Sequence, residues 1–454
     1  MTRNSGPRQL VRAAWPALLL LAIAACGGNY PNSTFLPTTE FNRDLTSTWN
    51  TMMFWATVVF VVVEVILIVA IVRYRRRPGT PEPKHVHGNT LMEITWTVLP
   101  LVVLGIIAVP TVRYIWKYQA PAPADALKVQ VIGHQWWWEF KYPQYNVSTA
   151  NEVYLQAGRA VEFELRTVDV LHSFWIPALG GKRDLINNKT NVLWFTPDST
   201  GEQAFIGSCN EYCGDSHANM RFRAYTVNAA NFESWARHQA ANAVFPPAPA
   251  APEAATAVPA ANTGATQAAP APAAPSTGFE FPREQMGAHT LPSTPIPSSL
   301  KFNEAALANG DATRGFETYS RSLCIGCHTI RGNPASRSPI GPDLTHLASR
   351  HTIAAGLFPN DAKHLAYWIK NAVAMKPGAK MQVVGKGEID AGPEQVCPGK
   401  AGVVREEVAD RHLACHHRVV ELQRREIAHD RIVQPHLPLI LQHQEGERGH
   451  RLGR

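Results

Sequence analysis

Four side chains that can bind a soft metal ion lie close together, between residues 209 and 220. They are the thiols of Cys209 and Cys213, the imidazole of His217 and the thioether of Met220. Sulfur ligands select copper, and a weak methionine ligand is typical of copper electron-transfer sites. A mononuclear copper site of that kind needs only one cysteine. Two cysteines at this spacing instead permit two thiolates to bridge a pair of copper ions.

Two other interpretations of this group stay open on residue types alone. Zinc also binds cysteine and histidine, although it prefers four cysteine, histidine or carboxylate ligands and rarely takes methionine. A disulfide between Cys209 and Cys213 would be a purely structural role. A further nitrogen ligand, His172, stands well upstream. A histidine from a distant strand is what a cupredoxin-like copper site requires to complete its coordination.

A second chemical signature, Cys-x-x-Cys-His, occupies residues 324–328. In c-type cytochromes the two cysteines attach haem covalently and the adjacent histidine is an axial ligand, which predicts these roles for Cys324, Cys327 and His328. The flanking segments are similar to small c-type cytochromes, and no βαβ pattern supports a thioredoxin-like site instead. An axial methionine raises the haem potential. The run before Met381 resembles the segment that supplies it, with Met375 as the second candidate.

The residues that must position these groups fall into two kinds of segment. Residues 125–230 contain runs in which apolar and polar residues alternate, for example at 127–132 and 160–165. Such alternation is typical of half-buried β-strands, so we expect an all-β sandwich that carries the first cluster. Residues 301–382, around the second signature, are expected to form an all-α domain.

Two apolar runs precede the sandwich, at residues 52–72 and 94–116, within a predicted hairpin over 43–117. Each is long enough to cross about 30 Å of hydrocarbon. Residues 1–25 have the pattern of a signal peptide, and the run ending at Cys26 resembles a lipoprotein cleavage box, which would make Cys26 lipidated. An ordinary signal peptide is the alternative. The loop between the runs is basic and therefore predicted to be cytoplasmic; it contains Arg73, Arg75, Arg76, Arg77 and Lys84.

Composition excludes several classes of protein. The 12 Trp, 17 Phe and 11 Tyr exclude a disordered chain, and seven Cys in 454 residues are too few for a disulfide scaffold. The net charge of +7 is scattered, and we expect no nucleic-acid partner. Residues 241–300 are predicted to be a linker rich in Ala and Pro. Residues 383–454 form an atypical tail, interpreted as a frameshifted C-terminus or as a metal-binding segment.

Residues 43–228 together resemble subunit II of a haem–copper cytochrome c oxidase, which carries a binuclear copper centre (CuA). The resemblance implies that the side chain of Glu211 also reaches a magnesium ion shared with subunit I. It implies the following copper ligands: His172, Cys209, the backbone carbonyl of Glu211, Cys213, His217 and Met220.

The same resemblance assigns two further residues. Trp136 matches the tryptophan through which electrons enter from cytochrome c, and Glu93 matches the acid at the mouth of a proton path into subunit I. Two departures stand near these positions. Trp137 replaces a tyrosine of the family, and residues 186–188 read Ile-Asn-Asn where the family often has Ile-Pro. Neither departure removes a ligand.

With its cytochrome-like part, the chain resembles the fused subunit II of caa3-type oxidases. This implies a membrane hairpin, a cupredoxin-like sandwich and an all-α cytochrome c domain. Electrons from an external donor would pass from haem c to the copper pair and on to subunit I, where dioxygen is reduced to water and protons are pumped. The chain would lie in the bacterial inner membrane with subunits I and III, both soluble domains being periplasmic. A nitric oxide reductase subunit and a copper storage or delivery protein are the alternatives; a quinol oxidase subunit would lack the copper ligands.

Overall fold

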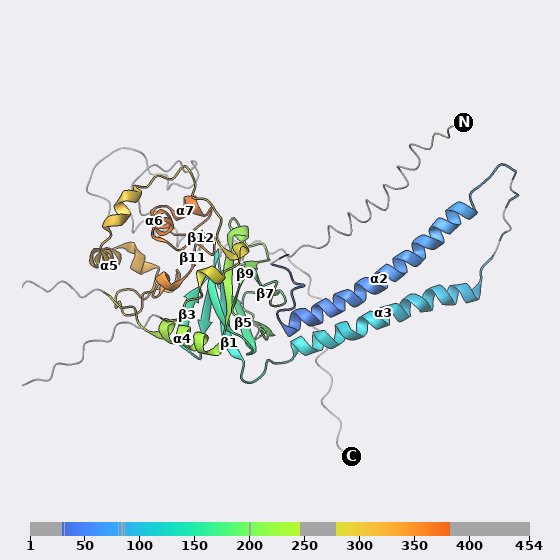
Figure 1. Ribbon diagram of the computed structural model, residues 1–454, viewed down its shortest axis with the longest axis horizontal. Coiled ribbons are helices and arrows are strands. Elements are labelled where there is room, and N and C mark those ends of the chain that lie inside the picture. Colours follow the sequence, from blue (N-terminus) through green and yellow to red (C-terminus); the bar gives the residue numbers. More distant parts are fainter. Residues whose placement is uncertain are drawn as a thin grey trace, which may run out of the picture. The chain divides into compact units, whose positions relative to one another are not determined.

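Two long helices open the part of the chain that the computed structural model describes (Figure 1). The described residues are 30, 32–79, 81–82, 85, 87–198, 201–245 and 278–381. Helix α2 spans Glu40–Arg73 and helix α3 spans Thr90–Gln119. Both are long and apolar enough to cross a membrane, and both extend past the predicted apolar runs. The predicted two-helix hairpin is therefore confirmed as a pair of membrane-type helices.

Polar contacts connect the outer ends of these helices to each other and to the domain that follows. Asp44 of α2 accepts hydrogen bonds from Lys117 Nζ and Tyr118 Oη of α3, both at 2.7 Å. Thr39 caps the N-terminus of α2 and donates to the carbonyl of Leu179 at 2.8 Å. The indole of Trp194 donates to the carbonyl of Ala120 at 2.9 Å, just after α3 ends. The membrane-type helices thus begin and end on the β-domain.

The β-domain is a sandwich of two five-stranded sheets, as the alternating runs predict. The first sheet has the order β3-β2-β1-β5-β8 and the second has the order β4-β10-β9-β6-β7. Helix α4, Ala229–Ala240, follows the last strand. The strands are β1 Leu127–His134, β2 Trp137–Tyr142, β3 Val147–Ala150, β4 Glu152–Gln156, β5 Val161–Thr167, β6 His172–Trp175, β7 Arg183–Leu185, β8 Asn191–Phe195, β9 Gln203–Cys209 and β10 Arg221–Val227.

Aromatic side chains from both sheets fill the core between them. Phe174 of β6 stacks on Phe222 of β10 with ring centroids 5.0 Å apart. Trp138 of β2 is fully buried and makes an edge contact with each of these rings. Such rings bury large apolar areas and hold specific relative orientations. The core therefore fixes β6 and β10, the strands next to the predicted metal ligands.

The described C-terminal residues form short helices and one small hairpin. The α-helices are α5 Ala312–Arg321, α6 Ala362–Lys370 and α7 Ala372–Met375, and the hairpin pairs β11 Thr352–Ile353 with β12 Phe358–Pro359. The 3-10 helices of this part are η2 Arg283–Gln285, η3 Ala288–Thr290, η4 Glu304–Asn309, η5 Leu323–Gly326 and η6 Leu347–Ser349. A further one, η1 His217–Asn219, lies between β9 and β10 of the sandwich.

Residues 278–290, at the end of the predicted linker, pack against the sandwich. Phe281 is 1% exposed and stacks on Tyr225 with ring centroids 5.0 Å apart. Met286 is buried in the same core cluster. These two apolar side chains are large, in contrast to the small Ala and Pro side chains before them, and apolar burial is the main force that attaches a segment to a core. The Ala- and Pro-rich residues 246–277 lie outside the described part.

A buried carboxylate joins the sandwich to the C-terminal hairpin. Glu152 of β4 is 2% exposed, and its Oε1 accepts bonds from the backbone amides of His351 and Thr352 at 2.9 and 2.8 Å. The hydroxyl of Thr352 donates to the same oxygen at 2.9 Å. Burial raises the pKa of Glu152 to about 7, although the Thr352 bonds and the nearby Arg350 oppose the rise.

This contact makes stability depend on pH. Because the folded-state pKa lies above the ordinary value, the folded protein holds the proton more tightly, and stability is lost as the pH rises through about 7. Gln at this position keeps an acceptor oxygen and cannot ionise. We expect the E152Q variant to match the wild type in stability near pH 5. Near pH 8, about one pH unit above the pKa of Glu152, we expect E152Q to be the more heat-stable protein.

The measurement is thermal unfolding of the purified chain in detergent across this pH range. The E152A variant is the reference for lost hydrogen bonds, since it leaves buried donors unpaired at a cost of about 1–3 kcal/mol and should be less stable at every pH. Parallel curves for E152Q and wild type would show that Glu152 does not titrate in this window.

Candidate metal centre

The loop between β9 and β10 brings the sulfur donors together. β9 ends at Cys209 and β10 begins at Arg221, and the two strands are antiparallel neighbours. The amide of Cys209 donates to the carbonyl of Met220 at 3.0 Å, which closes the loop at its base. The pairing of β9 with β10 therefore places Cys209 and Met220, at the two ends of the loop, beside each other.

The two thiols lie close together without being bonded. The Sγ atoms of Cys209 and Cys213 are 3.7 Å apart, whereas a disulfide requires about 2.05 Å. Both residues are buried and both are free thiols. The backbone carbonyl of Glu211 lies 3.2 Å from Cys209 Sγ, and Met220 Sδ lies 3.9 Å from Cys213 Sγ. The disulfide interpretation of this pair is not what the structure shows.

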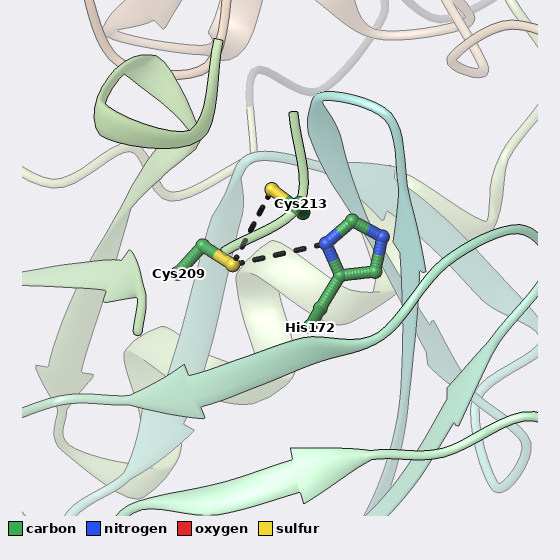
Figure 2. A group of neighbouring side chains, drawn as sticks. All are labelled: His172, Cys209 and Cys213. Atoms are coloured by element: carbon green, nitrogen blue, oxygen red, sulfur yellow. Dashed lines mark hydrogen bonds between the residues drawn. The ribbon is translucent and has the colours of Figure 1, made fainter. Parts of the chain in front are cut away.

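One imidazole flanks each sulfur. His172 is the first residue of β6, whose register places Phe174 opposite Cys209, and its Nδ1 lies 3.7 Å from Cys209 Sγ. Nδ1 of His217, in the loop, lies 3.5 Å from Cys213 Sγ. Figure 2 shows Cys209 and Cys213 directed toward one another and the imidazole of His172 directed toward Cys209. One donor atom each from His172, Cys209 and Cys213 lies within 4.8 Å of the other two.

This arrangement suits two copper ions better than one zinc ion. Zinc in structural sites takes four ligands in a tetrahedron. Here the two sulfurs lie between two separate imidazoles, and a carbonyl and a thioether supply two donors beyond four. Thiolate and thioether donors select copper. The residues present therefore fit copper, and they offer enough donor atoms to hold two ions.

Asp169 orients the imidazole of His172. Its Oδ1 lies 2.8 Å from His172 Nε2, and its Oδ2 accepts a bond of 2.6 Å from the amide of Gln135. Burial alone would raise the pKa of Asp169, but the bonds from His172 and Gln135 outweigh burial and lower it. A carboxylate on one ring nitrogen fixes the tautomer and turns the other nitrogen, Nδ1, toward the sulfurs.

The charges of the sulfur pair are coupled. The bond that Cys209 shares with Cys213 lowers the pKa of Cys209, and the same contact raises the pKa of Cys213. A thiol binds metal in its deprotonated form, so binding of metal to both sulfurs releases protons.

The aromatic run after β1 surrounds the sulfur loop on one side. Trp136 is 8% exposed and its Nε1 donates to the carbonyl of Cys213 at 2.9 Å. Trp138 is fully buried and its Nε1 donates to the carbonyl of Met220 at 3.3 Å. Trp137, the departure from the family, stacks on His134 with ring centroids 4.0 Å apart. Trp136 and Trp138 are thus each bonded to the backbone of a predicted copper ligand, and Trp136 is the more exposed of the two.

The remaining predicted residues lie elsewhere in the structure. Glu93 is in the first turn of α3 and is exposed. Cys324 lies in η5, and Cys327 and His328 follow it directly. Met381 is the last residue of the described part, which does not include Cys26, Lys84 or the tail 383–454. Asn187, in the second departure, donates to the carbonyl of Asp169 at 2.6 Å and so supports the residue that orients His172.

Sequence reasoning missed three residues near the sulfur loop. Asp169 stands three positions before His172, a spacing that offered a signal for a carboxylate–imidazole pair. Gln135 has no such signal, although its side chain donates to the carbonyl of Cys213 at 2.8 Å. Lys376 is buried, and its Nζ donates to the carbonyl of Trp136 at 2.5 Å. Burial lowers the pKa of Lys376 to about 7, and the nearby Cys213 opposes the shift.

The role of Asp169 can be tested by metal affinity. The D169N variant keeps the size of the side chain but removes its charge and one acceptor oxygen, so it cannot accept from both His172 and the amide of Gln135. We expect the affinity for copper to fall by about 10–100-fold, measured by competition with a chelator. D184N is the matched control, because Asp184 lies on neighbouring β7 and its carboxylate has no hydrogen bond or ion pair within the described residues. Equal affinities for D169N and D184N would contradict the role.

Comparison with known proteins places this chain in a family. Residues 37–114 match the family model "Cytochrome C oxidase subunit II, transmembrane domain", and residues 146–227 match "Cytochrome C oxidase subunit II, periplasmic domain". Cytochrome c oxidase subunit 2 of Alkalihalophilus pseudofirmus is 32% identical over 329 residues, which cover 71% of this chain and 77% of that protein. The same subunit of Bacillus subtilis is 30% identical, with 81% of this chain and 91% of that protein covered.

Among solved structures, the periplasmic domain of subunit II of cytochrome oxidase (CoxB) of Bradyrhizobium japonicum is 28% identical. The match covers 26% of this chain and 96% of that chain, with a TM-score of 0.25. The subunit II family binds the CuA copper centre. The chain belongs to the cytochrome c oxidase subunit II family and is a component of an oxidoreductase complex, in which it partners with the other oxidase subunits.

Proposed function

We propose that this chain is the electron-transfer subunit of an oxidase in which a c-type haem and a binuclear copper centre belong to one polypeptide. Electrons pass from the haem to the copper pair and on to subunit I, where dioxygen is reduced to water and protons are pumped. One observation carries the proposal: two unbonded thiols, 3.7 Å apart, are each flanked by an imidazole.

Six residues of the proposed centre would hold the copper pair: His172, Cys209, Glu211 through its carbonyl, Cys213, His217 and Met220. When bound, the pair takes up and releases one electron that its two ions share. The protein supplies a rigid set of donors, because His172 begins β6, Cys209 ends β9 and Met220 directly precedes β10, and the aromatic core holds these strands. Rigid donors reduce the rearrangement that accompanies a change in metal charge, which favours fast transfer.

The geometry around His328 supports a haem site at Cys324 and Cys327. The two cysteines and His328 lie on one turn, since the amides of Cys327 and His328 both donate to the carbonyl of Cys324. Nδ1 of His328 lies 2.8 Å from the carbonyl of Pro342, which leaves Nε2 free as an iron ligand. Burial lowers the pKa of His328 and favours the neutral ring that a metal requires. Haem c, when bound, supplies a one-electron carrier, for which Met381 is the proposed second ligand.

The comparison with the Bacillus subtilis protein also supports a shared C-terminal part. Residues 1–240 make up little more than half of this chain, whereas the match covers 81% of it and 91% of the relative. The match therefore extends well into residues that follow the sandwich. A match over this much of both chains supports a domain that follows the sandwich in both proteins.

Other assignments follow from the subunit II family. The carboxylate of Glu211 is exposed at the sulfur loop, as a magnesium ligand shared with subunit I would be. Glu93 lies in the first turn of α3, near the basic loop, and is the proposed mouth of a proton path into subunit I. The two soluble domains lie on the periplasmic side of the inner membrane, opposite that loop. Subunit III and an external donor complete the proposed set of partners.

Reciprocal substitutions test both centres in one preparation. The C213S variant loses one of two bridging thiolates, so the paramagnetic resonance signal of an electron shared between two copper nuclei should disappear, while the c-type haem α-band stays. The C324S/C327S double variant should lose covalent haem and keep the copper signal. Survival of the shared-electron signal in C213S would contradict the ligand assignment.

A further inference from the structure

Strand β1 has a glycine at an inward position beside the candidate metal centre. The inward residues of β1 stand at every second position, as alternation along a strand requires, and all four are buried: Leu127, Val129, Val131 and Gly133. The pattern calls for a fourth apolar side chain at position 133. Glycine there packs no side chain and weakens the interior of the strand. Its φ is not positive, so the backbone does not require glycine either.

The imidazole of His172 fills the space that a side chain at position 133 would take. A Cβ atom on Gly133 would lie 2.7 Å from Cδ2 and 3.1 Å from Cγ of His172, and 3.1 Å from Cδ2 of Leu185. Overpacking of this kind forces neighbouring side chains out of their positions. The end of the leucine side chain can move slightly by itself. Cγ and Cδ2 of the histidine belong to one planar ring, so a push on them displaces the whole imidazole.

Three neighbours confine this ring from other directions. Oδ1 of Asp169 lies 2.8 Å from Nε2 of His172. Trp138, which pairs with Gly133 between β1 and β2, packs at a tilt with its ring centroid 6.0 Å from that of the imidazole. Leu185 of β7 pairs with His172 in the second sheet. His172 is fully buried, so its ring lies in a closed pocket whose side toward the first sheet is the backbone of Gly133.

We propose that Gly133 is a positioning residue of the copper centre, because the lack of a side chain there leaves room for the His172 imidazole to face the sulfurs. In this position Nδ1 lies 3.7 Å from Sγ of Cys209 while Nε2 stays on Asp169. A methyl group at position 133 pushes the rigid ring away and moves Nδ1 with it. Gly133 acts only through His172. The identity of the metal rests on the proposed function, whereas the steric relation between Gly133 and His172 is independent of it.

A double-mutant cycle in the metal-free full chain, purified in detergent, tests the steric relation. G133A should lower the unfolding temperature of the wild type, because the methyl group collides with the imidazole. In the H172A background that space is empty, so G133A should be neutral or raise the unfolding temperature, since alanine also restricts the unfolded chain. If G133A alone does not fold, we expect G133A/H172A to recover folding. An equal effect of G133A in both backgrounds, or no recovery, would overturn the proposal.

G180A is the matched control for this cycle. Gly180 is also buried and has no positive φ, and a Cβ atom there would lie 2.5 Å from Cδ1 of Phe195, so the collision with an aromatic ring is at least as close. The three atoms nearest to that Cβ all belong to Phe195, which is not a proposed copper ligand. G180A should lower the unfolding temperature by the same amount with and without the imidazole of His172. A loss from G180A that also vanishes in H172A would overturn the assignment of the G133A effect to the imidazole.

The second readout is pulsed paramagnetic resonance of the copper-loaded chain, compared at equal copper content. In the wild type and in G180A, nitrogen couplings from two imidazoles should be present. In G133A one of these couplings should weaken, and the affinity for copper, measured by competition with a chelator, should fall by about 10–100-fold. Couplings and affinity equal to the wild type in a folded G133A would overturn the positioning role and leave the proposed function intact. Absence of any copper signal in the wild type would overturn the proposed function instead, and the double-mutant cycle would still decide the steric relation.

Discussion

Two buried thiols held 3.7 Å apart without a bond are the constraint on which the site depends. Side by side in a low-dielectric interior, two thiolates repel one another. The hydrogen bond that Cys213 shares with Cys209, together with burial, raises the pKa of Cys213. Positive charge shared between the sulfurs relieves the repulsion, and the two flanking imidazoles are neutral donors that add no further charge. The fold keeps the thiols apart because Cys209 belongs to β9 while Cys213 belongs to the loop, and the β9–β10 ladder fixes where that loop begins and ends.

The surrounding structure fixes the positions of the side chains around the two thiols. The aromatic core locks β6 against β10, which sets the position of His172, and Asp169 then sets the rotation of its ring. Asp169 also binds the amide of Gln135, next to Trp136, so the imidazole and the tryptophan are positioned by one carboxylate. Trp136 in turn donates to the carbonyl of Cys213. The sulfur loop, the distant histidine and the aromatic run thus form one connected network.

Sequence patterns predicted the parts of this architecture that depend on local order. Period-two alternation predicted the sandwich, two long apolar runs predicted the membrane-type helices, and the spacing from Cys209 to Met220 predicted donors on one loop. Contacts between distant segments had no such signal. Lys376 meets Trp136 across 240 positions and Glu152 meets Thr352 across 200, and both contacts join polar residues that carry no periodic pattern. Asp169 was predictable only in part. Its spacing of three residues from His172 is a local signal, whereas its bond to the distant Gln135 has none.

The most direct measurement is X-ray absorption at the copper edge of the purified, copper-loaded chain. If two thiolates bridge two ions, the spectrum contains a copper–copper scattering contribution together with sulfur and nitrogen neighbours, and metal analysis gives two copper ions per chain. A single copper ion per chain with no metal–metal contribution would contradict the account, as would a site that retains only zinc after copper is supplied.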